Sequence, residues 1–451
     1  MKDDMRGLYL EGILSVPYFL LTQGIVFSSV AIHFGLKGIL ISVANALPVS
    51  FQIFQLVSPY ISEKIGSRKS MTLIFIGFSR IVWPLALVIL LLMDILDPFQ
   101  FFIWFAITQM SASMGNSSWI SWMRDLIPPD VRGRVLGRRN FFVSISSMIF
   151  VYLFTLMIEK LSAGYVLVSS ISLVSSALSI YAVYSLEDVP LKRSGFLASL
   201  KKVLSDENFM KLVRFFFVWN MVIMSSSAFF GYHLIKVLKV PLSYTGVMSI
   251  ISGVLLMIFY RIYGEVSDSI GHKSVAEIGI ILVSITAMIW LFMDERTFSK
   301  LLVVDAILTG LGWSAVNLSL TTLPMEVASG TEQAYFSLYY AMGGVGGILG
   351  SVIGGIVGHF LSDRIVHLGD WKLHGLQLMF FFCGLARLST IVLLDRIDVK
   401  RYIPIRRMVF NFLALSARRV PIRPIEYSIG VIRSRLRRLK RREREDEGRQ
   451  G

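Results

Sequence analysis

The chain carries one acidic, glycine-bearing, basic segment twice, as SPYISEKIGSRKS at residues 58–70 and as YGEVSDSIGHKS at residues 263–274. A carboxylate at a helix end can accept hydrogen bonds from the unpaired N–H groups of a second helix and is stabilised by its positive end. Neighbouring Lys and Arg side chains can add ion pairs. Contacts of this kind bias an equilibrium between two conformations when only one conformation makes them. An ordinary basic turn is the alternative interpretation of either segment alone.

Four charged residues stand within long apolar runs, namely Glu11, Arg80, Asp305 and Arg387. A buried arginine requires a partner or water, and we predict that Glu11 pairs with Arg80. Glu11 could instead carry a coupling proton. Asp305 stands near the end of its run and could be exposed at the membrane surface.

The sequence contains no pattern that predicts catalysis or a bound cofactor. It lacks the glycine loop followed by Lys-Ser or Lys-Thr that cradles phosphate. The six histidines have no metal-ligand spacing with cysteine or carboxylate, and the single cysteine, Cys383, cannot form an intramolecular disulfide. We therefore expect neither an enzyme nor a metal or cofactor site.

The elements that position these residues are long apolar segments. The chain is 54% hydrophobic and 17% charged, whereas a soluble domain has about 25% charged residues. Twelve runs approach the length of about 20 residues that spans a bilayer as a helix. They cover residues 8–33, 38–62, 70–93, 98–122, 140–159, 164–186, 211–235, 242–263, 274–293, 300–325, 332–360 and 374–395. Their apolar residues do not alternate with polar ones, which argues against a barrel.

The distribution of Lys and Arg predicts the orientation in the membrane. With the first residue inside, the inner segments before residue 396 hold eighteen basic residues and the outer loops hold eight. Both termini are therefore expected to be cytoplasmic, in the plasma membrane. The run after MKDDMR is longer than a signal-peptide core, so we interpret it as a retained first helix.

The repeated segment follows the second and the eighth apolar run, which indicates an internal duplication of six helices. We expect an all-α membrane protein of twelve transmembrane helices in two bundles. The expected divisions are a first bundle at 1–186, a linker at 187–210, a second bundle at 211–395 and a basic cytoplasmic tail at 396–451.

The repeated segments resemble a loop of the major facilitator superfamily. The second copy supplies Gly264, Asp268, Gly271 and Lys273, and the first supplies Glu63, Gly66, Arg68 and Lys69. Pro59 stands where the first copy would have its first glycine. The resemblance implies secondary transport by alternating access, with these eight residues as a conformational latch.

A second segment, WISWMRDLIPPDVRGRVLGRRNFF at residues 119–142, is similar to a loop of bacterial and archaeal members of that superfamily. Pro128 and Pro129 are expected to end the preceding helix. Gly133 is expected to permit a tight turn. Its counterpart, TLPMEVASGTEQAY, lacks the arginines, so the two loops are not expected to act alike.

The same resemblance implies a central cavity lined by the first, fourth, seventh and tenth runs. The candidate cavity residues there are Gln23, Gln109, Asn116, Trp219, Asn220, Trp313 and Asn317. Amides can hydrogen-bond a polar cargo, and tryptophan can pack against it. Hydrogen bonds between helices are the alternative role of each amide. The low charge of these runs favours a neutral or amphipathic cargo.

Glycines recur every fourth residue in the eleventh run, at Gly346, Gly350, Gly354 and Gly358. They fall on one helical face, where the absence of side chains lets another backbone approach closely. We predict a helix-packing surface there.

The tail from Arg396 onward carries 17 basic and 6 acidic residues. Basic clusters beside a membrane attract anionic lipids, so we expect the bilayer, and not nucleic acid, to be its partner. A solvated, disordered tail is the alternative. The predicted protein is a monomeric transporter of an unidentified small molecule with or without a coupling ion. The alternative function is a non-transporting membrane receptor or scaffold that acts through this tail.

Overall fold

The computed structural model describes residues 2–36, 44, 47–190, 195–240, 242–330, 333–362, 364–368 and 371–404. The greater part of the expected basic tail, from residue 405, lies outside them. The first helices are α1 (Lys2–Leu20), α2 (Gly24–His33), η1 (Phe51–Val57), α4 (Ser58–Ile65), α5 (Arg68–Leu92), α6 (Pro98–Leu126), η2 (Pro129–Val131), α7 (Arg132–Lys160) and α8 (Gly164–Tyr184). The later elements are α9 (Phe196–Ser205), α10 (Glu207–Tyr232), η3 (His233–Val237), α11 (Leu242–Ile270), α12 (His272–Ile289), η4 (Trp290–Phe292), α13 (Phe298–Val327), α14 (Ala334–Leu361), β1 (Ile365–Leu368), β2 (Trp371–His374) and α15 (Gly375–Asp395).

Within the described residues, ten helical segments are long and apolar enough to cross a membrane. The predicted runs at 38–62 and 98–122 are not among them. The first of these is described only in part, as η1 and α4 and the residues just before them. The second forms α6, whose 29 residues reach about 43 Å but include many polar side chains. Twelve spans therefore stay a prediction, while a multi-pass helical membrane protein is established.

The first predicted run is not one continuous helix. It breaks between α1 and α2, where Gln23 is extended and Gly24 has a φ of +80°. A break exposes carbonyl groups that a helix would otherwise use. The indole Nε1–H of Trp83 donates to the Leu21 carbonyl over 2.9 Å, and the Thr22 hydroxyl donates to the Phe19 carbonyl. These contacts stabilise a kink that the apolar pattern does not reveal.

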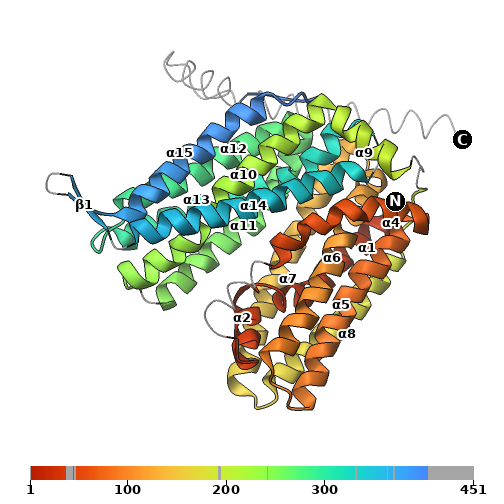
Figure 1. Ribbon diagram of the computed structural model, residues 1–451, viewed down its shortest axis with the longest axis horizontal. Coiled ribbons are helices and arrows are strands. Elements are labelled where there is room, and N and C mark those ends of the chain that lie inside the picture. The colour runs from red at the N-terminus through yellow and green to blue at the C-terminus, as the bar shows by residue number, and fades with distance from the viewer. Residues whose placement is uncertain are drawn as a thin grey trace, which may run out of the picture. The chain divides into compact units, whose positions relative to one another are not determined.

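Small polar residues allow the amino-terminal helices to pack closely. α5 contacts both α6 and α8, and α1 contacts α8 (Figure 1). Ser172 and Ser175 of α8 donate to the carbonyls of Pro17 and Leu14 on α1. In a bilayer, where apolar burial does not drive association, small side chains and interhelical hydrogen bonds of this kind hold helices together.

The glycine stripe of α14 packs against α10, as predicted. A Cβ at Gly346, Gly350 or Gly354 would collide with the backbone carbonyl of Phe217, Met221 or Ser225, respectively. The fourth position, Gly358, faces the ring of Phe229. Only glycine permits this approach along four turns, which explains the regular spacing.

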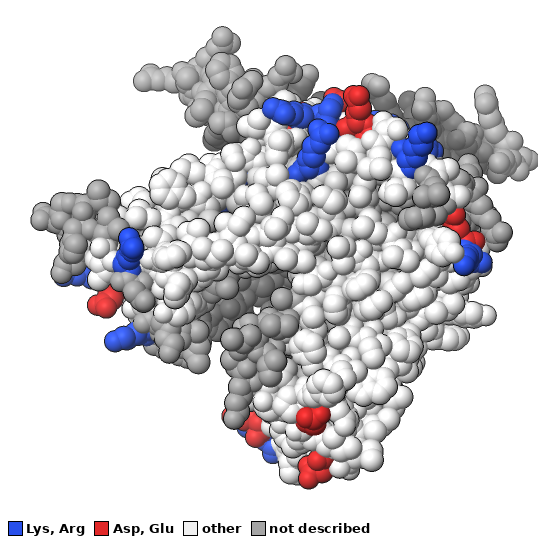
Figure 2. Space-filling model, in the orientation of Figure 1, with Lys and Arg blue, Asp and Glu red and all other residues white. Residues whose placement is uncertain are grey.

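The described surface matches a bilayer environment. In Figure 2 the blue and red side chains gather at the margins of the face, and a wide region between them is white. Large apolar residues such as Leu92, Phe99 and Tyr181 are exposed. Apolar surface of this extent is unfavourable in water, whereas lipid tails solvate it.

One short hairpin departs from the all-helical prediction. β1 and β2 pair antiparallel, with Ile365 opposite His374, between α14 and α15. Each strand has only four residues, too few for an alternating pattern to identify.

Candidate functional site

The amino-terminal half (α1 to α8) and the carboxyl-terminal half (α9 to α15) meet where α7 begins and α11 ends. The Asp268 carboxylate accepts the backbone N–H of Gly133 over 2.8 Å and that of Arg134 over 2.9 Å. These two N–H groups belong to the first turn of α7, where backbone N–H groups have no acceptor within their own helix. The negative carboxylate also lies at the positive end of that helix. Asp268 therefore joins the two halves.

Glycines allow α7 and α11 to come this close. A Cβ on Gly133 would overlap Ser267 and Asp268, and a Cβ on Gly137 would overlap the Tyr260 carbonyl. Gly264 of α11 lies directly against Gly133. The expectation of a tight turn at Gly133 is wrong, because the residue is helical and is required for close approach. Pro128 and Pro129 do follow the end of α6, as predicted.

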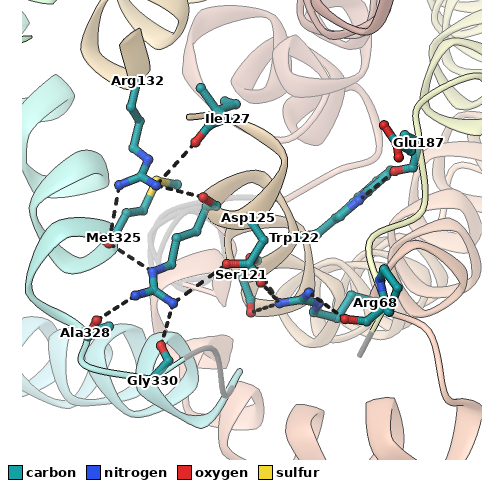
Figure 3. Close-up of polar contacts among 12 residues, drawn as sticks. Arg68, Ser121, Trp122, Asp125, Ile127, Arg132, Glu187, Met325, Ala328 and Gly330 are labelled. Carbon is teal, nitrogen blue, oxygen red and sulfur yellow. Dashed lines mark hydrogen bonds and ion pairs between the residues drawn. The ribbon is translucent and has the colours of Figure 1, made fainter. Parts of the chain in front are cut away.

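Two arginines of the amino-terminal half reach the end of α13 (Figure 3). Arg124 donates to the carbonyls of Met325 at 3.0 Å and Ala328 at 2.6 Å, and also to that of Gly330. Arg132 donates to Met325 over 3.4 Å. These carbonyls lie at the negative end of α13, where cations are favourable. From the sequence, Arg124 and Arg132 indicated only the orientation in the membrane. The counterpart segment TLPMEVASGTEQAY lacks arginines, so it cannot make the same contact in return.

The first copy of the repeated segment makes a different set of contacts. Arg68 is buried and donates to Asp125 over 2.7 Å and to Ser121 over 3.1 Å (Figure 3). Lys69 donates to the Leu186 carbonyl, and Gly66 ends α4 with a φ of +83°. Among the described residues, the Glu63 carboxylate has no hydrogen-bond partner. All of these contacts remain within the amino-terminal half.

Near the first repeated segment, the contact between the halves is made by a glutamine instead of a carboxylate. Gln333, just before α14, donates to the hydroxyls of Ser58 on α4 and, over 3.1 Å, Ser117 on α6. The three side chains are buried. The halves are thus joined by an amide and two hydroxyls here and by Asp268 on the other side. A glutamine beside a helix start is a weak sequence signal, so this contact was missed.

The segment after α15 reinforces the Asp268 contact. Arg401 donates to the Asp268 carbonyl over 2.8 Å and to the Asp130 carboxylate over 3.0 Å, so it touches both halves. Lys273 donates to the carbonyls of Asp395 and Ile397, each over 2.9 Å. Gly271 has a φ of +99° and contacts the Arg401 carbonyl where a side chain would not fit. We call residues 396–402 the strap.

Asp206 anchors the loop after α13 to the start of α10. Its carboxylate accepts from the Phe209 N–H at 3.0 Å, the Ser329 hydroxyl at 2.7 Å and the Tyr335 hydroxyl at 3.1 Å. Burial alone would raise the pKa of Asp206, but these donors outweigh it and lower the pKa below its ordinary value. The loop that receives Arg124 is therefore held from both sides.

A crevice of about 1030 Å³ borders these contacts and is lined by residues that include Arg124, Asp268 and Arg401. Because each of these three residues makes a hydrogen bond to the other half, the crevice is part of the junction. A separate cavity of about 430 Å³ lies between α1, η1, α5, α6, α7, α13 and α14. This second cavity is the candidate for cargo.

Of the predicted cavity residues, Gln109 and Asn116 line this second cavity. The other five are not among its lining residues. Gln23 lies at the break before α2, Asn220 bonds to the Phe216 carbonyl of its own helix, and Asn317 donates to Tyr260. Trp219 and Trp313 pack edge to face with ring centres 6.4 Å apart.

The cavity includes polar residues that the sequence analysis did not assign to it. Gln52 and Gln55 lie in η1, three residues apart within an apolar run. Tyr340 of α14 lies on the opposite wall. Because the two glutamines are three residues apart, their spacing alone predicts that they lie on the same face of a helix.

The predicted pair of Glu11 and Arg80 forms, and it has a third member. The Glu11 carboxylate accepts from Arg80 over 2.8 Å and from Arg139 over 2.6 Å, with 1% of its side chain exposed. Arg80 also donates to Ser179 over 2.6 Å. All three charged residues line the cavity.

The intramembrane charges of the other half lie apart from the cavity lining. Arg387 donates to the Val283 carbonyl over 3.0 Å and to Ser226 over 3.1 Å. Asp305 accepts from the indole of Trp290 over 2.9 Å and is half-buried, so it is not the exposed surface residue that the sequence also allowed. Within the described residues, no group of three His, Cys, Asp or Glu side chains could hold a metal ion.

Comparisons with known proteins connect this geometry to a family. The sequence model of the Major Facilitator Superfamily matches residues 13–351. No curated protein sequence matches the chain. The crystal structure of the human organic anion transporter MFSD10 is 15% identical, with a TM-score of 0.64, over 87% of this chain and 99% of that one.

Two further solved structures are similar in fold. A bacterial homologue of the iron transporter ferroportin, in an outward-facing state, is 15% identical with a TM-score of 0.63, covering 88% and 98% of the two chains. The fucose:proton symporter FucP of E. coli is 14% identical with a TM-score of 0.63, also covering 88% and 98%. At such identities the likeness shows a common fold alone.

Proposed function

The chain belongs to the Major Facilitator Superfamily, and we propose that it is a secondary active transporter that moves a small molecule by alternating access. Its family and its apolar helices make it a multi-pass membrane transporter. The single observation that carries the mechanism is the Asp268 carboxylate of one half on the α7 N-terminus of the other. Contacts of this type can be lost without disturbing the fold of either half.

The proposed bodies are the bundles at 1–186 and 211–395, linked by 187–210. In the described conformation they are joined near Asp268, Arg124 and Gln333, and the cargo cavity lies between them. In the opposite conformation these contacts separate and the cavity opens to the side they now close. Of the eight residues of the two repeated segments, Asp268 acts on this equilibrium across the halves, and Arg68 and Lys69 hold together their own half.

We place the protein in the plasma membrane with both termini cytoplasmic, on the basis of its Lys and Arg distribution. The junction contacts then lie on the cytoplasmic side. The runs at 38–62 and 98–122 complete the proposed set of twelve spans. The basic tail associates with anionic lipid of the inner leaflet.

Spin labels on the two halves test the mechanism. The sites are Arg134→Cys on α7 and Ser269→Cys on α11, both exposed, in a Cys383→Ala background. Distances measured by pulsed electron resonance in nanodiscs are expected to include a short population and a longer one. Asp268→Asn should enlarge the longer population, because the amide has one acceptor oxygen and presents an NH₂ to the second N–H of α7.

Glu265→Gln is the matched control, since Glu265 is an exposed carboxylate on the same helix. It should leave both populations unchanged. A single distance that Asp268→Asn does not alter, in a protein that remains folded, would contradict alternating access about this contact.

A further inference from the structure

The charged residues of the cavity do not balance. Among its described lining residues, the charged side chains are those of Glu11, Arg80 and Arg139. Glu11 uses one oxygen for Arg80 and the other for Arg139. A single carboxylate compensates one guanidinium, so the wall keeps an excess of one positive charge. In a low-dielectric interior an excess charge is unfavourable without a counter-charge.

The same wall contains donors without acceptors. Arg80 Nε and Trp119 Nε1 are buried and have no hydrogen-bond partner within the described structure. Arg80 is 4% exposed. The Arg139 guanidinium lies over the Trp119 ring, 5.0 Å from its centre. Buried donors of this kind are normally satisfied, so two donors of this wall lack an acceptor.

The opposite wall has a different character. It is formed by Leu318 and Thr321 of α13 and Tyr340 of α14, and none of these is charged. The cavity volume of about 430 Å³ falls in the range of about 300–1000 Å³ typical of small-molecule sites. A cargo with one charged end and one apolar end matches the two walls.

We propose that the cavity binds an organic monocarboxylate, with its carboxylate beside Arg139 and Arg80 and its apolar part against Leu318 and Tyr340. The inference rests on the proposed transport function and adds a substrate class to it. The sequence analysis favoured a neutral or amphipathic cargo because the runs expected to line the cavity carry little charge, and it placed Arg139 outside those runs. In the structure α7 begins at Arg132, so Arg139 falls two turns into the helix and on the cavity wall.

The test compares carboxylates with their uncharged amides, using the full chain in nanodiscs. The probes are octanoate with octanamide and 3-phenylpropionate with 3-phenylpropionamide. A ligand that binds the folded state raises the melting temperature by mass action. We expect at least one carboxylate to stabilise the protein and its amide, at equal concentration, to leave the melting temperature unchanged.

Substitutions at Arg139 and Arg138 test which guanidinium group binds the carboxylate. Arg139→Gln leaves the Glu11 and Arg80 pair neutral and should weaken carboxylate binding by about tenfold or more. Arg139→Lys keeps the charge and should retain most of the affinity. Arg138→Gln is the matched control, because Arg138 is exposed and does not line the cavity. It should bind as the parent does.

The proposal is overturned if the amides stabilise as well as the carboxylates, if no carboxylate stabilises the parent, or if Arg139→Gln binds unchanged. Flux into proteoliposomes is measured separately. Carboxylate-selective binding without flux would support the anion site and contradict transport. Flux of an amide without preference for its carboxylate would support transport and contradict the anion site.

Discussion

At the scale of single residues, the strongest constraint is the Glu11 carboxylate shared by two guanidinium groups. Removing one partner of a buried ion pair leaves an uncompensated charge, and this costs more than the pair itself contributes. Loss of Glu11 would leave Arg80 and Arg139 facing each other across the cavity wall. Loss of Arg139 would leave a neutral pair. The two substitutions should therefore differ sharply in their effects on stability.

Glu11→Gln is expected to lower the free energy of unfolding by about 3–5 kcal/mol, as measured by unfolding in mixed micelles. Arg139→Gln should cost much less. Glu159→Gln, at an exposed position near the end of α7, is the control and should change stability by no more than about 0.5 kcal/mol. Melting of Glu11→Gln at the parent temperature would show that the carboxylate has no structural role.

At the scale of elements, close helix packing depends on which glycine faces a backbone. On α14, Gly350 faces the Met221 carbonyl of α10, whereas no atom lies within 4 Å of a Cβ built on Gly355. Both residues are helical, so alanine brings the same gain in helix propensity at each. The difference in stability between alanine variants at these two positions therefore measures the packing contact alone.

We predict that Gly350→Ala destabilises the protein by about 1–3 kcal/mol through overpacking. Gly355→Ala should be neutral or slightly stabilising. Thermal unfolding of the two variants side by side measures the difference. Equal melting temperatures would mean that α10 and α14 can separate without cost.

The strap is the second element with a testable role. Arg401 contacts the Asp268 carbonyl and the Asp130 carboxylate, and so bridges the halves. Arg401→Ala should enlarge the long-distance population of the spin-labelled pair. Arg396 is an exposed arginine of the same segment whose side chain has no hydrogen bond to the described residues, so Arg396→Ala should leave this population unchanged. Identical distance distributions for the two variants would exclude the strap from the latch.

At the scale of the whole molecule, a duplicated sequence produces contacts that are not duplicated. The Asp268 carboxylate accepts from two N–H groups across the halves, but the Glu63 carboxylate has no hydrogen-bond partner among the described residues. Gln333 with Ser58 and Ser117 makes the corresponding contact. The contacts between the halves are therefore asymmetric.

This asymmetry predicts unequal effects of matched substitutions. Hydrogen bonds to a charged group contribute about 1.5–3 kcal/mol each, so Asp268→Asn should shift the distance populations about tenfold or more. Glu63→Gln should shift them little. The spin-labelled pair described above provides the measurement, and equal shifts would restore a symmetric latch.

The sequence was sufficient for several particular features of the fold and site. The glycine spacing on α14 predicted its packing face, and Glu11 was the available acidic partner of Arg80 in that half. It was insufficient where a contact joins residues far apart in the chain. Arg124 on Met325 and Gln333 on Ser58 depend on the docking of two bundles, for which local periodicity contains no information.

By itself, the sequence determined that most of the chain lies in a bilayer and that one polar segment is repeated. Apolar runs of membrane length require a bilayer, because backbone groups in lipid must be satisfied within helices. The repeated polar segment then predicted two related halves. Only the tertiary structure decided which side chains face the cavity, because a helix can present any of its faces until its neighbours pack. Arg139 is the clearest case, since the start of α7 and its approach to α1 place a residue expected in a loop beside Glu11.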